Sequence, residues 1–231
     1  EITVNRLPKL GYEPNYFIEV LTSGEMIWQS LENQNYDFTR NLKKNCYYMH
    51  DYSKKDEKNF IDGLEKFNFV KNIQDADFIL ATTLFPGYNT IDYIPLLTKA
   101  IKKKLPFICA NPDYETIENN SDEINICMGT IAQLYKSLGG EIFILGKPEI
   151  DIYIESTKKI KKLNKSRVLV VGDSMYHDIQ GANSFGVDSL LITSGIHQSS
   201  FDGKKPRWET NINQVNNLGI SPTFLCSKFQ I

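Results

Sequence analysis

Long apolar runs are missing from this sequence of 231 residues. No stretch approaches the ~20 residues that a membrane-spanning helix needs, and no secretory signal opens the chain. The sequence also lacks a C-x-x-C pair, because its four cysteines, at positions 46, 109, 127 and 226, are scattered. Isolated cysteines in apolar segments are typical of buried thiols in a reducing compartment. We therefore expect a cytoplasmic protein that does not insert into a membrane.

An excess of charge of either sign is missing too, since the formal net charge is −2. Such a balance gives no electrostatic reason to expect nucleic acid or an anionic membrane as a partner. Hydrophobic residues make up 41% of the chain, which is ordinary for a globular protein. The length allows one large domain or two small ones. A small-molecule partner remains the expectation, and whether the chain forms a homo-oligomer stays open.

Short apolar runs alternate with helical patterns along the chain, and this alternation predicts an α/β fold with a parallel sheet and helices on both faces. Strands are predicted at Phe17–Leu21, Cys46–Met49, Phe78–Thr82, Phe107–Ala110, Ile142–Leu145, Val168–Val171, Ser189–Thr193 and Thr223–Cys226. Helices are predicted at Ile2–Leu10, Gly24–Leu31, Glu57–Phe67, Ile91–Lys103, Met128–Leu138, Ile150–Leu163 and Ile179–Phe185. Ligands bind such sheets beyond the carboxyl ends of the strands, where functional residues are therefore sought.

The strongest motif of this kind runs from Val168 to Asn183, where an apolar strand ends in Gly172 and Asp173. A second acid, Asp178, follows at the start of the next predicted helix. Two carboxylates at one sheet edge suit Mg²⁺, which takes one or two protein carboxylates and keeps water and phosphate as other ligands. Without a ligand, the same residues would be read as a turn residue and a helix N-cap.

Two further strands end in polar groups. Lys147 lies in Gly146-Lys147-Pro148, between a strand and a helix, where a cation could bind phosphate or neutralise carboxylates. Asn111-Pro112-Asp113 follows an earlier strand, and, taken alone, its polar groups are better explained by hydrogen bonds within a turn. In both cases the polar residues stand where a parallel sheet places its ligands.

Taken in this order, the three segments resemble the haloacid dehalogenase superfamily, and more narrowly its class IIA, the NagD-like phosphatases. Gly-Lys-Pro is similar to the third motif of the superfamily, and Gly-Asp-Ser-x-x-x-Asp-Ile-x-Gly-Ala-Asn to the fourth. Asn111-Pro112-Asp113, the earlier Leu21-Thr-Ser-Gly-Glu25 and the later Leu190-Leu-Ile-Thr-Ser-Gly-Ile-His197 match features of class IIA. The resemblance covers nearly the whole chain.

The resemblance implies a Rossmann-like parallel-sheet core with an inserted α/β cap, and a Mg²⁺-dependent phosphatase that hydrolyses a small phosphorylated metabolite, such as a sugar phosphate or nucleotide, through an aspartyl-phosphate. The core would comprise residues 1–44 and 139–231, and the cap residues 45–138. Asp173 and Asp178 would hold the metal ion. Lys147 would act in catalysis and bind the substrate phosphate. Asn111 and Asp113 would approach the leaving group.

The chain departs from the superfamily pattern in one respect, because no Asp-x-Asp follows a strand. Asp75-Ala-Asp77 precedes its predicted strand and would lie at the opposite edge. We therefore expect the nucleophile and the first core strands to lie outside this sequence, which starts at Glu1, and the chain alone to be inactive. The alternatives are a pseudoenzyme that binds a phospholigand and a serine esterase of the Gly-Asp-Ser-Leu type with Ser174 as nucleophile.

Overall fold

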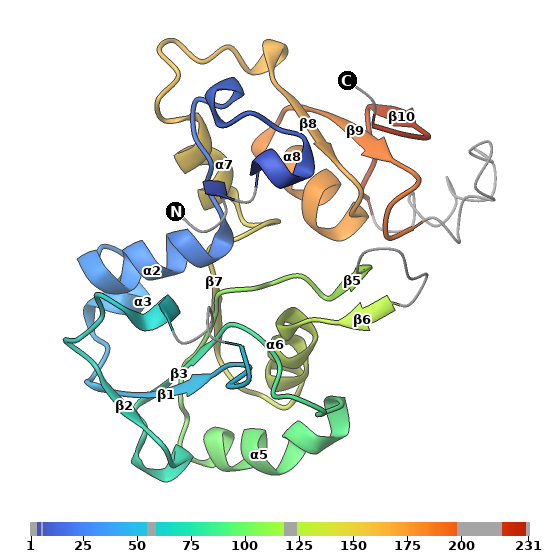
Figure 1. Ribbon diagram of the computed structural model, residues 1–231. Coiled ribbons are helices and arrows are strands. Elements are labelled where there is room, and N and C mark those ends of the chain that lie inside the picture. The colour runs from blue at the N-terminus through green and yellow to red at the C-terminus, as the bar shows by residue number, and fades with distance from the viewer. Residues whose placement is uncertain (1–3, 6, 55–58, 118–123, 198–218, 230–231) are drawn as a thin grey trace.

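The computed structural model describes residues 4–5, 7–54, 59–117, 124–197 and 219–229, which form two parallel sheets and one short antiparallel pair (Figure 1). The larger sheet has the order β2-β1-β3-β4-β7, and the smaller has the order β10-β9-β8. The strands are β1 (Asn45–Met49), β2 (Asn68–Val70), β3 (Phe78–Ala81), β4 (Phe107–Cys109), β5 (Glu115–Ile117), β6 (Ile124–Ile126), β7 (Ile142–Ile144), β8 (Leu169–Gly172), β9 (Asp188–Ile192) and β10 (Phe224–Cys226).

The α-helices are α2 (Ser23–Asn33), α3 (Asp37–Arg40), α5 (Ile94–Lys102), α6 (Met128–Ser137), α7 (Ile150–Thr157) and α8 (Gln180–Phe185). A π-helix, η7 (Met175–Ile179), leads directly into α8. Shorter 3-10 turns are η1 (Leu7–Leu10), η2 (Pro14–Tyr16), η3 (Asn59–Ile61), η4 (Ile73–Asp75), η5 (Thr90–Tyr93) and η6 (Lys165–Arg167). The predicted α/β class with a parallel sheet is confirmed.

Alternate residues of the central strands face two separate apolar clusters. Phe78 and Leu80 of β3 pack with α2, whereas Ile79 and Ala81 belong to the cluster on the opposite face, which includes residues of α5 and α6. Side chains that alternate along a strand point to opposite faces of a sheet. Because both faces are covered, β3 is buried along its whole length, as expected for a central strand of a parallel sheet.

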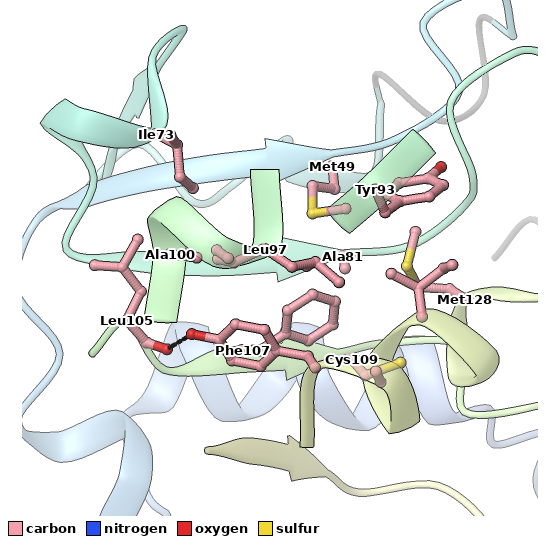
Figure 2. Close-up of a cluster of buried hydrophobic side chains, with 14 of the residues drawn as sticks. Met49, Ile73, Ala81, Tyr93, Leu97, Ala100, Leu105, Phe107, Cys109 and Met128 are labelled. Carbon is pink, nitrogen blue, oxygen red and sulfur yellow. Dashed lines mark hydrogen bonds between the residues drawn. The ribbon is translucent and has the colours of Figure 1, made fainter. Parts of the chain in front are cut away.

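One of these clusters lies between α5, α6 and the sheet (Figure 2). Met49, Leu97 and Phe107 come from β1, α5 and β4, and all are fully buried. At the edge of the cluster, Tyr135 donates a hydrogen bond of 2.7 Å to the carbonyl of Leu105, which satisfies the only polar group of this large side chain. The cluster fixes α5 and α6 on one face, and so fixes the loops that follow β1, β3 and β4.

The smaller sheet is much less covered. Its own cluster of buried residues consists of Met175, Ile179, Leu191 and Ile220. Among the described residues β8 pairs with β9 alone, and Leu169 and Val171 are 47% and 39% exposed. The extended segment before α2 lies near the end of α7, since Glu19 forms an ion pair of 2.8 Å with Lys159. The two sheets therefore differ strongly in how much apolar surface they bury.

Several predicted elements are wrong or shorter than expected. Residues 17–21 form no strand, since this extended segment pairs with no strand among the described residues. The described part of the helix predicted at Glu57–Phe67 is a 3-10 turn followed by further turns, because Gly63 has a φ of +87° and carries the chain past Trp28. Residues 57 and 58, and parts of the predicted Ile2–Leu10 helix, lie outside the described residues. Helix α7 ends at Thr157, six residues early.

The larger sheet crosses one boundary of the predicted domains. β7 lies in the second part of the predicted core, yet it pairs with β4 in register Ile108↔Phe143. The other strands of this sheet, β1 to β4, all come from the predicted cap at 45–138. The division into core and cap stays a prediction, while the ladder itself joins residues of both parts.

Candidate functional site

Polar side chains from two different sheets meet where β7 and β8 end. Lys147 follows β7 of the larger sheet, and Asp178 lies in η7 after β8 of the smaller one. The ammonium Nζ of Lys147 donates a hydrogen bond of 2.7 Å to Oδ1 of Asp178. The expected convergence of these residues is therefore present, although their strands belong to separate ladders rather than to one sheet edge.

Asp178 is held almost completely inside the protein, with 4% of the residue exposed. Its Oδ2 accepts a hydrogen bond of 3.1 Å from the backbone N–H of Ser174, so both carboxylate oxygens have partners. The N-cap of this helix is Ser174, which excludes the interpretation of Asp178 as a simple N-cap. A Cβ at Gly172 would lie 2.1 Å from Cγ of Asp178, so only glycine leaves room for this carboxylate.

Asp173 occupies the turn directly after β8. Its Oδ2 accepts a hydrogen bond of 3.1 Å from the backbone N–H of Ile196, in the loop that follows β9. Gly195 lets this loop come close, because a Cβ there would lie 2.1 Å from the same oxygen. Among the described residues Oδ1 has no hydrogen-bond donor, which leaves it available to a cation.

The charges around Lys147 favour its protonated form. Burial by itself would lower the pKa of Lys147, but the opposite charge and hydrogen bond of Asp178, together with the charges of Asp113 and Asp173, raise it above its ordinary value. Asp113 follows β4, Asp173 lies in the turn after β8, and Asp178 lies in η7. They keep a positive charge at the place where a substrate anion would have to be neutralised.

Asn111-Pro112-Asp113 follows β4 and lies beside this site. Asp113 is exposed and its charge acts on Lys147, as described above. Pro112 is buried, and a Cβ at Gly146 would lie 2.7 Å from its Cγ, so the segment packs tightly against the residue that precedes Lys147. The structure thus brings Asp113, Lys147, Asp173 and Asp178 together, with Asn111 in a neighbouring cleft.

His177 is a residue of this site that the sequence motifs did not indicate. It is 5% exposed, and its Nε2 lies 3.2 Å from the carbonyl oxygen of Pro112. Because a carbonyl only accepts, Nε2 carries the proton. Nδ1, 2.8 Å from Oγ of Ser174, then accepts from that hydroxyl. His177 therefore ties the loop after β4 to the helix that carries Asp178.

This arrangement does not favour the esterase alternative. Ser174 is 6% exposed, and its hydroxyl is engaged by His177 one helical turn away. The late histidine, His197, accepts a hydrogen bond of 3.1 Å from the backbone N–H of Met175 instead of contacting Ser174. Burial lowers the pKa of His197, an effect that the charge of Asp173 partly offsets. A nucleophilic serine needs an accessible hydroxyl paired with a base, and Ser174 lacks the access.

A cleft of about 420 Å³ opens beside the site. It is lined by residues that follow β1, β3 and β4, among them Asp51, Thr83, Asn111 and Asp113. The sequence motifs did not assign Asp51 to a binding site. The Asp75-Ala-Asp77 pair lies at the opposite end of the strands, where Oδ2 of Asp77 accepts a hydrogen bond from the backbone N–H of Asn45, the first residue of β1. Its exclusion as a catalytic pair is consistent with this place.

A metal ion at this site would be held mainly by Asp173. The part of the chain that the structure describes contains no group of three or more His, Cys, Asp or Glu side chains that could hold a metal ion. The donor set nevertheless fits Mg²⁺, which accepts one or two protein carboxylates and completes its shell with water and phosphate. Asp178, whose two oxygens are occupied by protein donors, fits a role in orienting that shell.

No described helix is long and apolar enough to cross a bilayer.

Comparisons with known proteins agree with this geometry. Residues 144–218 match the family model described as HAD-hydrolase-like. An acid sugar phosphatase of Staphylococcus aureus is 23% identical over 156 residues, which are 67% of this chain and 53% of the relative. A haloacid dehalogenase-like hydrolase from Brucella suis has a TM-score of 0.72 and 28% identity over 86% of this chain and 70% of its own. NagD from Escherichia coli has a TM-score of 0.56 and 19% identity over 97% of this chain and 76% of its own.

The chain spans about half the length of the curated relatives that it matches. The matched family segment contains Lys147, Asp173 and Asp178, the residues that the structure brings together. The fold is shared with hydrolases of the same superfamily over most of the chain. In its motifs, its fold and the match over residues 144–218, this protein is similar to hydrolases of the haloacid dehalogenase superfamily.

Proposed function

We propose that this chain provides most of the substrate and metal site of a Mg²⁺-dependent phosphomonoesterase acting on a small phosphorylated metabolite. The observation that carries the proposal is the ion pair of 2.7 Å between Lys147 and Asp178, with Asp113 and Asp173 close enough to raise the pKa of the same lysine. A lysine held by carboxylates at the ends of parallel strands is suited to bind a phosphoryl group. The similarity to an acid sugar phosphatase of Staphylococcus aureus favours a sugar phosphate over a nucleotide.

Each residue has a distinct role in this proposal. The Lys147 ammonium neutralises the phosphoryl oxygens, and Asp178 holds it in place. Asp173 would hold Mg²⁺ through Oδ1, while its Oδ2 stays bonded to Ile196. Bound there, the ion supplies charge neutralisation to the phosphate. Asn111 and Asp113 lie on the side of the leaving group, and residues 45–138 would act as the cap that surrounds it.

The proposed reaction requires an attacking carboxylate that residues 1–231 do not supply. The only Asp-x-Asp of the sequence lies at the amino ends of the strands. Covalent phosphoryl transfer needs an in-line nucleophile close to the phosphate, so the 231-residue chain alone should have negligible activity. The competing proposal is a protein that binds a phosphorylated ligand without turning it over. A cytoplasmic location is part of both proposals.

The test is the hydrolysis of p-nitrophenyl phosphate at varied Mg²⁺ by the 231-residue chain and by the product of the whole reading frame. We expect turnover only where the reading frame adds an Asp-x-Asp after an apolar strand. In that protein, Asp173→Asn should abolish activity, while Asp178→Asn should cost about 10–100-fold, as is typical for a residue that orients the metal shell. Activity of the Asp173→Asn variant close to that of the parent would contradict the proposed metal site. A whole reading frame without turnover would favour the binding protein.

A further inference from the structure

The cleft beside the catalytic site contains a carboxylate that the proposed reaction does not use. Asp51 follows β1 and is only 9% exposed, yet it lines the cleft. Its Oδ1 accepts hydrogen bonds from the backbone N–H and the hydroxyl of Ser53, at 2.9 and 2.5 Å. Its own N–H donates to Oγ1 of Thr83, at 2.9 Å, from the loop after β3. These three bonds fix the position of the carboxylate.

The second oxygen of Asp51 has a weaker partner. Nζ of Lys54 lies 3.7 Å from Oδ2, and the Lys54 side chain is 63% exposed. An exposed ion pair at this distance contributes little and is easily replaced by another donor. The hydroxyl of Ser53 is the main cause of a lowered pKa of Asp51, so the side chain stays negatively charged. The cleft thus presents a fixed anionic acceptor, which calls for a ligand with hydrogen-bond donors.

The remaining walls supply neutral polar groups and two aromatic rings. Thr116 and Asn125 line the cleft together with Asn111, and these groups can donate as well as accept. Phe85 and Tyr88 pack edge to face, with ring centroids 5.3 Å apart, and both line the same cleft. Rings beside several polar groups are typical of sites that bind molecules with both C–H and O–H surfaces. A volume of about 420 Å³ accommodates a ligand of the size of a monosaccharide.

Asp113 connects this cleft with the site of the phosphate. It lines the cleft, and its charge acts on Lys147. A ligand whose phosphate lay at Lys147 would therefore extend past Asp113 toward Asp51. Two carboxylates, Asp51 and Asp113, and one cation, Lys54, line the cleft, so the formal charge of its lining is −1 and disfavours a second anionic group.

We infer that the cleft binds the neutral polyhydroxy part of a monophosphorylated substrate. The hydroxyls of this part donate hydrogen bonds to Asp51, and a substrate that carries a second phosphate group is excluded from the cleft. This inference deepens the proposed function and rests on it for the position of the phosphate. It makes Asp51 a residue that determines specificity. The cleft would also select sugar monophosphates over sugar bisphosphates, two classes of ligand that the motifs around Lys147 and Asp173 do not distinguish.

The first experiment uses the cleft without the phosphate. The 231-residue chain, labelled with ¹⁵N, is titrated with D-glucose, D-ribose and glycerol, and the amide shifts of Thr83, Asn111 and Asn125 are followed. At least one of the three polyols should shift these amides. Asp51→Asn keeps an acceptor for Ser53 but removes the charge, so it should weaken the binding about tenfold, the equivalent of one hydrogen bond to a charged group.

The matched control is Asp37→Asn, which removes a carboxylate of which 95% of the side chain is exposed, outside the cleft. This variant should bind the polyol as the parent does. The inference is overturned when none of the polyols shifts the cleft amides, or when Asp51→Asn and Asp37→Asn bind equally well. A shift of the cleft amides together with no response of Lys147 and Asp178 to inorganic phosphate would support the cleft assignment and contradict the proposed function instead.

The second experiment measures how strongly the cleft discriminates between ligands with one and with two phosphate groups. D-glucose 6-phosphate should bind more tightly than D-fructose 1,6-bisphosphate to the parent chain in the presence of Mg²⁺. Asp51→Asn should narrow this difference, because it removes one of the two repelling carboxylates. Equal or tighter binding of the bisphosphate by the parent would overturn the exclusion of a second phosphate.

Discussion

The five-stranded and the three-stranded sheet both carry residues of the site, but they differ in how completely their apolar side chains are buried. The larger sheet has apolar clusters on both faces, and β3 and β4 are buried along their whole lengths. The smaller sheet has a cluster of four buried residues, and its edge strand β8 exposes Leu169 and Val171. Lys147 and Asp113 follow strands of the larger sheet, whereas Asp173 and Asp178 follow a strand of the smaller. The site therefore joins a densely packed part of the molecule to a sparsely packed one.

The largest expected effect is on the free energy of unfolding, which should fall more when an apolar side chain is truncated in the larger sheet than in the smaller one. Phe78 of β3 is fully buried and packs edge to face on Phe67, with ring centroids 5.3 Å apart. Phe78→Ala should lower the free energy of unfolding by about 3–5 kcal/mol, because it leaves a cavity in the core. Leu169→Ala in the half-exposed position of β8 should cost about 1 kcal/mol or less. Chemical denaturation of both variants measures the difference, and similar losses would contradict the comparison.

An intermediate effect is expected for His177, whose side chain connects the loop after β4 to η7. His177→Asn can keep the contact with the Ser174 hydroxyl but not with the Pro112 carbonyl, whereas His177→Gln can reach Pro112 and loses Ser174. A buried carbonyl without a donor costs about 1–3 kcal/mol. We therefore expect faster amide exchange of residues 113–116 in the Asn variant than in the Gln variant. If the amides of residues 113–116 exchanged at the parent's rate in both variants, His177 would not fix the position of the loop after β4.

The sequence was sufficient to predict the strands of continuous apolar runs, and β1, β3, β4, β7, β8, β9 and β10 all overlap the predicted positions. β2, β5 and β6 were missed because three residues without a clear pattern give too weak a signal. Residues 60, 61, 64 and 67 have helical spacing, yet Gly63 adopts a positive φ that ends any helix there. Periodicity reports which side chains are buried, and here a series of turns buries them.

The candidate site was partly predictable for a related reason. Lys147, Asp173 and Asp178 each follow a strand, so the position of their strands implied that they meet. His177 depends on a contact with Pro112, which lies 65 residues away in the sequence, and no local pattern contains that contact. Asp51 follows a strand as well, but its place in the cleft depends on Thr83 and Ser53, from two different loops.

The measurement that tests the central claim most directly is the binding of inorganic phosphate to the 231-residue chain, by calorimetry with and without Mg²⁺. The parent should bind phosphate more tightly when Mg²⁺ is present. Lys147→Ala should weaken this binding at least about tenfold, because a hydrogen bond to a charged group is lost. Lys158→Ala, which removes a largely exposed lysine of an ion pair with Glu155 next to α7, should bind as the parent does. Equal phosphate affinity of Lys147→Ala and the parent would contradict the assignment of this site.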